Sequence, residues 1–239
     1  MYSQAFAQHA LIYVPPEVGR AGSSTGSWRS LSEAVVVWDG PPSMRTRFSL
    51  QSVYGDLREF FCEQVRIPDC PDDVLLQELR HVSDTIGNKR LEEADHVRVY
   101  QVLRDIDSEL AKNTTLVDLM ARAASTPEFQ RLRFIPFRTV RGELRLGRLV
   151  DTLYIPDQRG DFANMFKDAV SMVTLPPEDP DGSLAALRRL LNTVWRTSSL
   201  KMLDNSTVRC EIEGGRNHQW HVDNEGTRRY NSSVRFIER

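Results

Sequence analysis

Three residues that could bind a metal ion stand close together late in the sequence. Cys210, His218 and His221 fall within twelve residues. Thiolate and imidazole are ligands that zinc prefers, but a structural zinc site needs four ligands in a closed tetrahedron. The spacing matches no familiar zinc pattern, and no pair of cysteines stands at the separation that such sites use. We therefore predict no metal and no other cofactor.

A possible nucleophile lies in a segment rich in glycine and serine. Gly22-Ser23-Ser24-Thr25-Gly26 matches the G-x-S-x-G pattern, in which a strained turn between a strand and a helix exposes the serine hydroxyl. Here a proline-containing loop precedes the pattern and a tryptophan-containing segment follows it. The required context is missing, so we interpret residues 19–27 as a flexible loop. A hydrolase at Ser24 is an alternative that we disfavour, and we predict no catalytic residue.

Arginines are concentrated in a segment whose sequence pattern predicts a β-hairpin. They are Arg131, Arg133, Arg138, Arg141, Arg145 and Arg148, with Glu143 as their acidic neighbour. Lining one face of a two-stranded ribbon, they could contact the phosphates of nucleic acid. The chain as a whole carries a net charge of -2, so we favour a solvated face on which arginine stems cover apolar neighbours. A nucleic-acid-binding module stays the alternative, and Arg133, Arg138, Arg141 and Arg145 are candidate contact residues.

Composition indicates a globular protein that can build a core without disulfide bonds. Hydrophobic residues make up 40% of the chain and charged residues 27%. No run approaches the roughly 20 apolar residues of a membrane span. The first residues lack the basic and apolar regions of a signal peptide. We expect an intracellular protein, cytoplasmic or nuclear, without a membrane partner.

The elements that would position these residues are organised around a short strand. The apolar run from Ala34 to Trp38 ends abruptly at Asp-Gly-Pro-Pro, which indicates a buried strand followed by an enforced turn. Apolar residues at helical spacing between residues 53 and 65 predict a helix that covers it, with Tyr54, Phe60 and Phe61 on the buried face. We predict that Trp38 is buried against this face. Trp28, beside the flexible loop, is the better candidate for an exposed contact residue.

The remaining pattern predicts helices first and strands later. Helices are expected at about 71–87, 91–110 and 115–124, then a hairpin at about 133–140 and from 144, and a strand near 153–157. A further amphipathic helix carries Trp195 as a structural residue. No alternation of strand and helix suggests a parallel sheet, so the predicted class is α+β. We divide the chain into a strand-plus-helices part (1–126), a hairpin-and-helix part (127–203) and a weakly patterned tail (204–239).

Two stretches resemble a known protein family. The first contains Leu11-Ile-Tyr-Val-Pro, Val37-Trp-Asp-Gly-Pro-Pro, Leu50-Gln-Ser-Val-Tyr54 and Leu57-Arg-Glu-Phe-Phe61. The second contains Arg133-Phe-Ile-Pro-Phe, Tyr154-Ile-Pro-Asp157 and Leu187 to Leu203. Together they resemble the accessory region that follows the GHKL-type ATPase module in sacsin-like proteins of the fungal and plant NO VEIN type. The resemblance covers about two thirds of the chain and fades beyond Leu203.

This resemblance implies an accessory role. The chain shows neither the helix with the metal-binding asparagine nor the glycine-rich lid of the ATPase module, so the resemblance assigns no nucleotide-binding residue here. It implies a middle piece of such a protein, or a derivative of one, that acts by protein contact. We therefore expect a non-catalytic interaction module with a protein partner.

Overall fold

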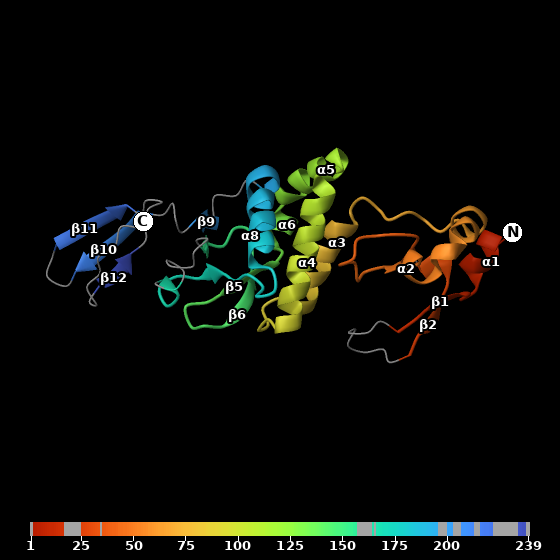
Figure 1. Ribbon diagram of the computed structural model, residues 1–239, viewed down its shortest axis with the longest axis horizontal. Helices are drawn as coiled ribbons and strands as arrows, with labels where there is room; N and C mark the ends of the chain where they lie inside the picture. The colour runs from red at the N-terminus through yellow and green to blue at the C-terminus, as the bar shows by residue number, and fades with distance from the viewer. Residues whose placement is uncertain are drawn as a thin grey trace.

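The computed structural model shows an α+β fold, as predicted from the order of the elements. It describes residues 2–16, 25–33, 35–156, 164 and 166–195, and the strands at 200–202, 207–212, 216–221 and 234–237. Figure 1 shows short strands and helical turns in the first part of the chain, a group of helices in the middle, and further strands after them.

The first part is built from short elements. These are α1 (Tyr2–Gln8), β1 (Ile12–Val14), β2 (Ser27–Arg29), η1 (Leu31–Glu33), β3 (Val36–Val37), β4 (Phe48–Ser49), α2 (Gln51–Tyr54), η2 (Gly55–Leu57) and η3 (Phe60–Val65). Strands β1 and β2 pair antiparallel, whereas β3 and β4 pair parallel. The helix predicted over 53–65 forms, but its type changes along the chain, from α2 through the 3-10 helix η2 to the π-helix η3. Gly55 stands at the first change of type, where a poor helix former is expected.

Four helices follow, of which the first three lie close to their predicted positions, whereas the fourth was not predicted. They are α3 (Val74–Ile86), α4 (Glu93–Leu110), α5 (Thr114–Ala124) and α6 (Pro127–Arg131). The side chain of Asn113 accepts a hydrogen bond from the backbone N–H of Leu116 and so caps α5, and Thr126 caps α6 through Phe129. These caps explain why α5 and α6 begin where they do.

The predicted hairpin belongs to a larger, mixed sheet. The strands are β5 (Ile135–Arg138), β6 (Leu144–Gly147), β7 (Leu153–Ile155), β8 (Met172–Val173) and β9 (Leu200–Met202), in the order β6-β5-β8-β7-β9. Strand β5 is antiparallel to β6 and β8, while β7 is parallel to β8 and β9. Helix α8 (Pro180–Arg189) and the π-helix η4 (Leu190–Trp195) follow β8, and α8 lies beside α4 (Figure 1).

The weak pattern after residue 204 predicts no element, yet three strands form there. They are β10 (Thr207–Ile212), β11 (Arg216–His221) and β12 (Val234–Ile237), paired antiparallel in the order β11-β10-β12. Strand β10 does alternate, with Val208, Cys210 and Ile212 at every second position, but β11 is mostly polar, so the segment as a whole shows a weak pattern. The predicted boundaries between the three parts of the chain, after residues 126 and 203, stay predictions.

Strand β3 contributes to two separate apolar clusters. Val36 and Trp38 belong to the cluster of the first part, which ends at Ile67. Val37 belongs to the larger cluster, which extends from α3 to Trp195. Successive side chains of a strand point to opposite sides, so this two-residue strand places one side chain in each cluster.

The loop between β3 and β4 is fastened to the helices by two carboxylates. Glu78 of α3 has no solvent exposure, and its Oε1 accepts the backbone N–H of Arg45 at 2.8 Å and of Thr46 at 2.6 Å. The hydroxyl of Thr46 donates to the same oxygen at 2.5 Å. On α4, Asp105 accepts the backbone N–H of Ser43 at 2.8 Å. These bonds connect the first part of the chain to the helices.

We expect Glu78→Ala to destabilise the protein strongly, because it leaves the N–H groups of Arg45 and Thr46 without an acceptor inside the fold. Buried donors without partners cost about 1–3 kcal/mol each, so the free energy of unfolding should fall by about 2–4 kcal/mol. Urea denaturation followed by circular dichroism measures it. Asp84→Ala removes an exposed carboxylate from the same helix and serves as the control. Equal stability of the two variants would contradict this role of Glu78.

Candidate functional site

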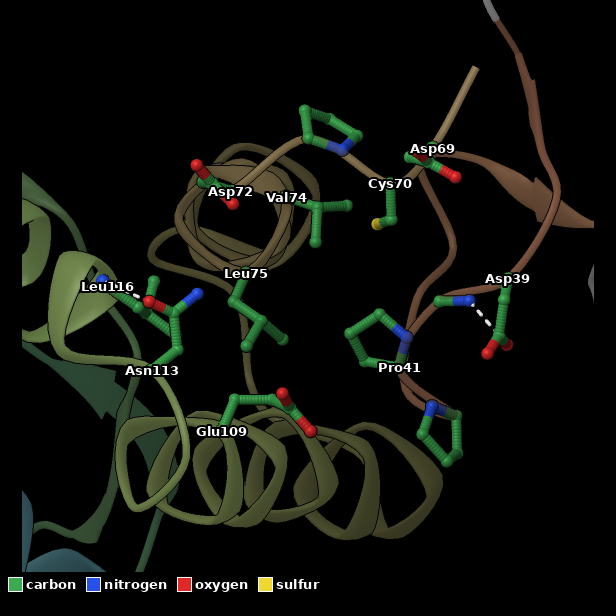
Figure 2. A pocket seen from close by; sticks show the side chains of 13 residues that line it. Asp39, Pro41, Asp69, Cys70, Asp72, Val74, Leu75, Glu109, Asn113 and Leu116 are labelled. Atoms are coloured by element: carbon green, nitrogen blue, oxygen red, sulfur yellow. Dashed lines mark hydrogen bonds between the residues drawn. The ribbon is translucent and has the colours of Figure 1, made fainter. Parts of the chain in front are cut away.

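A cavity of about 380 Å³ lies where the first part of the chain meets the helices. Its walls come from the turn at 39–42, from residues 69–75 that lead into α3, and from residues 109–116, where α4 ends and α5 begins. Figure 2 shows these three segments around the cavity. The volume lies within the range of sites that bind small molecules or single side chains.

Part of the cavity wall is apolar. Val74 and Leu75, from the first turn of α3, are buried, as is Leu116 of α5. Pro41 and Pro71 add their rings to the walls, and Leu75 and Pro41 face each other across the space in Figure 2. The prolines also fix the backbone, since each one lies at the start of a turn or helix.

Carboxylates surround this apolar surface. Asp39 accepts the backbone N–H of Gly40 at 2.7 Å, and Glu109 pairs with Lys112 at 2.9 Å. Asp69 and Asp72 are exposed and have no hydrogen bond or ion pair within the part of the chain that the structure describes. Among the residues that the structure describes, no lysine, arginine or histidine lines the cavity. The site is therefore negatively charged.

Cys70 carries the only thiol among the described residues of the cavity wall. Its environment keeps this thiol protonated. Burial raises the pKa of its thiol to about 11, with Asp39, Asp73 and Glu78 adding to the rise and Arg47 opposing it. A thiol with a raised pKa is a poor nucleophile at neutral pH. Among the described residues, no group of three or more His, Cys, Asp or Glu could hold a metal ion. The geometry suits binding better than catalysis.

The structure describes only some of the residues that were considered, and disfavoured, as a nucleophile or as metal ligands. Ser24 lies outside the described residues. Cys210 is the register partner of His218 on β10 and β11, whereas His221 pairs with Thr207. The pairing brings Cys210 and His218 side by side in the backbone and places His221 further along the strand.

The arginines of the predicted hairpin do not gather on one face. Residues directly opposite each other in an antiparallel pair share a face, and Arg145 lies opposite Phe137 while Arg138 lies opposite Leu144. Since Phe137 and Arg138 are adjacent on β5, Arg138 and Arg145 project from opposite faces. Arg141 is exposed in the turn, and Arg131 is the last residue of α6 rather than part of the hairpin.

Most of these guanidinium groups have partners within the hairpin region. Arg133 donates to the carbonyl of Leu146 at 3.2 Å and Arg138 to that of Gly142 at 3.3 Å. Arg145 pairs with Glu143 at 2.7 Å. Arg148 pairs with Asp151, also at 2.7 Å. These contacts shape the turns at either end of β6.

The two tryptophans of the first part differ in burial as predicted. Trp38 is 5% exposed and its ring lies 6.3 Å from Phe61, which in turn lies 5.2 Å from Tyr54. Trp28 is 61% exposed and lies 5.3 Å from Tyr13, its register partner on β1. The predicted burial of Trp38 and exposure of Trp28 are confirmed.

The other predicted structural aromatics also lie in apolar surroundings. Trp195 is buried, 5.2 Å from Phe134 and 6.2 Å from Phe129. Phe60 is half-buried rather than fully buried, and packs edge-on against Phe6 and Phe61.

Sequence reasoning missed the cavity as a site. It identified Asp39-Gly-Pro-Pro as a turn and Pro71 with Asp72 and Asp73 as a helix start, each from local pattern. The third wall, at Glu109 and Asn113, is distant in sequence, so no local signal joins the three segments.

Comparison with known proteins finds no matching family model, curated protein or solved structure. Within the described residues, every helix is too short or too polar to cross a membrane.

Exchange of the two tryptophans for alanine should have very different effects. Trp38→Ala removes a buried ring, which typically costs about 3–5 kcal/mol, so we expect a large loss of stability. Trp28→Ala removes an exposed ring and should change the free energy of unfolding by less than about 1 kcal/mol. Thermal denaturation of both variants against the parent measures this. The assignment is wrong if Trp28→Ala is the less stable of the two.

The loop between β6 and β7 should contribute acid-dependent stability through Asp151. Burial pushes the pKa of this carboxyl up, but hydrogen bonds and the charge of Arg148 outweigh burial and hold the pKa below its ordinary value. A carboxyl with a lowered folded-state pKa stabilises the fold above its unfolded-state pKa. That contribution is lost as the pH falls through the folded-state value, between about pH 5 and pH 2.

Asp151→Asn should therefore flatten the pH dependence of unfolding in that acid range and leave it unchanged near neutrality. Urea midpoints measured across the range give the comparison, with the exposed Asp84→Asn as the control. Identical profiles for the parent and Asp151→Asn would show that the ion pair adds no pH-dependent stability.

Proposed function

We propose that this chain is a non-catalytic accessory module that acts by contact with another protein, within or derived from a sacsin-like ATPase protein. The observation that supports it is the exposed aromatic pair of Tyr13 and Trp28 on the β1–β2 ribbon. Aromatic side chains are enriched at protein interfaces, because they offer a large contact area at a small cost in conformational entropy.

The pair is held in place by its surroundings. Tyr54 donates its hydroxyl proton to the backbone carbonyl of Tyr13 at 2.8 Å, which fastens β1 to α2. The Tyr13 ring lies over Gly26, where an added Cβ would come within 2.2 Å of the Tyr13 hydroxyl. On the other face of β1, Ile12 is buried in the first apolar cluster. The ribbon thus presents Tyr13 and Trp28 from a fixed support.

The proposed partner follows from the sequence resemblance. Leu11-Ile-Tyr-Val-Pro, which contains Tyr13, is one of the segments that resemble the region after the ATPase module of sacsin-like proteins. In that family the accessory region follows the ATPase module in the same chain, which favours contact between the two. We therefore propose the GHKL-type ATPase module of a sacsin-like protein as the partner and assign the hydrolysis of ATP to that module alone. An intracellular location goes with this proposal.

The arginine hairpin offers less support for the nucleic-acid alternative. Its guanidinium groups lie on both faces of the ribbon, and Arg145 and Arg148 already pair with carboxylates. A surface for phosphates would place free cations on one face.

Binding to a purified sacsin-like ATPase module, measured by calorimetry, tests the proposal. We expect Trp28→Ala to weaken binding by about tenfold or more, since a central interface tryptophan contributes at least about 1.4 kcal/mol. Val140→Ala removes an apolar side chain of 46% exposure from a distant turn and should leave the affinity unchanged.

Three outcomes would contradict the proposal. The first is equal affinity of the parent and Trp28→Ala for the ATPase module, or no binding by either. The second is ATP hydrolysis by the purified chain. The third is binding to duplex DNA or RNA with a steep dependence on salt, which is the signature of phosphate contacts.

A further inference from the structure

We infer that the cavity between the 39–42 turn, residues 69–75 and the end of α4 binds the side chain of an arginine presented by a partner polypeptide. The inference rests on the proposed function as a protein-contact module and adds a second contact site with its own chemistry. It is argued from the shape of the cavity, the charge around it and the absence of a cation in its wall.

The charge of the cavity favours a cationic occupant. Asp39, Asp69, Asp72 and Glu109 line it, and none of the basic side chains that the structure describes does. Lys112 neutralises part of the charge of Glu109, but Asp69 and Asp72 have no ion pair or hydrogen bond in the described part of the chain. Elsewhere in the helical part, carboxylates such as Asp107 and Asp179 pair with arginines of the chain itself. Arg47 acts on Cys70 from outside the described wall, so the described fold compensates the charge of the cavity only in part.

The shape of the cavity indicates a side chain rather than a metal ion. The described residues contain no group of three or more ligand side chains close enough to hold one ion. Figure 2 shows the carboxylates placed around the space instead of converging on a point. Between them lie apolar surfaces from Val74, Leu75 and Pro41. An occupant with an apolar stem and a cationic head matches both features.

Arginine fits this arrangement better than lysine. Its guanidinium group is planar, weakly hydrated and carries five donors that can reach carboxylates on different sides, whereas the lysine ammonium is compact and strongly hydrated. The apolar rings of Pro41 and Pro71 give the weakly hydrated guanidinium group a surface to lie against.

The test is a titration of the full chain with N-acetyl-arginine amide, followed by the backbone amide signals in heteronuclear NMR spectra. We expect saturable shifts at Gly40, Cys70 and Leu75. The citrulline analogue has the same shape without the charge and should cause no saturable shift. The lysine analogue should bind more weakly than the arginine analogue.

Matched variants assign the effect to the cavity. Replacing Asp69 and Asp72 together by asparagine should weaken arginine binding by about fivefold, since two exposed ion pairs contribute together about 1 kcal/mol. Replacing the exposed Asp56 and Asp84 by asparagine gives the same net charge and should leave binding unchanged. The spectra also show directly whether each variant is folded.

The inference is overturned if citrulline shifts the same signals as arginine, if lysine binds as strongly, or if the Asp69/Asp72 variant binds as the parent does. No partner protein takes part in this titration. A chain that binds the ATPase module through Trp28 but takes up no arginine overturns this inference alone. Arginine binding without any contact to the ATPase module would contradict the proposed partner and leave the cavity assignment standing.

Discussion

The buried carboxylate of Glu78 is the interaction on which the arrangement of the two apolar clusters depends. A charge without solvent contact is costly unless hydrogen bonds and an opposite charge compensate it. Here the compensation comes from the backbone of Arg45 and Thr46, with Arg98 at 3.9 Å from the second carboxylate oxygen. The helix can bury Glu78 only when the β3–β4 loop delivers those N–H groups, so the two parts of the chain must fold onto each other.

This constraint also shapes the candidate site. The turn at 39–42 belongs to the same β3–β4 loop that Glu78 and Asp105 hold, and it forms one wall of the cavity. Two residues further on, Met44 is buried in the larger cluster. The cavity wall therefore has the rigidity of a core element, although its residues are partly exposed. A contact site on such a support loses little entropy when a partner binds.

Local sequence patterns were sufficient for the long helices and for the burial of Trp38. Helices α3 and α4 run for several turns, so their apolar periodicity repeats often enough to be recognised in the sequence. Strands of two or three residues, such as β8 and β9, offer no such repetition, and the mixed sheet around the hairpin was not predicted for that reason. The cavity could not be predicted from the sequence for a different reason. Its three walls are distant in sequence and come together only in the tertiary fold.

The contrast between Trp28 and Trp38 shows what the sequence does specify. Both are tryptophans near strands, but Trp38 ends an apolar run and is followed by a turn that keeps it inside, while Trp28 stands among serines and arginine. The neighbours determine which ring is buried for stability and which remains available for contact. An aromatic surface gives affinity with little discrimination, and a charged cavity rejects partners of the wrong sign. Under the proposal of protein contact, Trp28 would supply affinity and the cavity would select the partner.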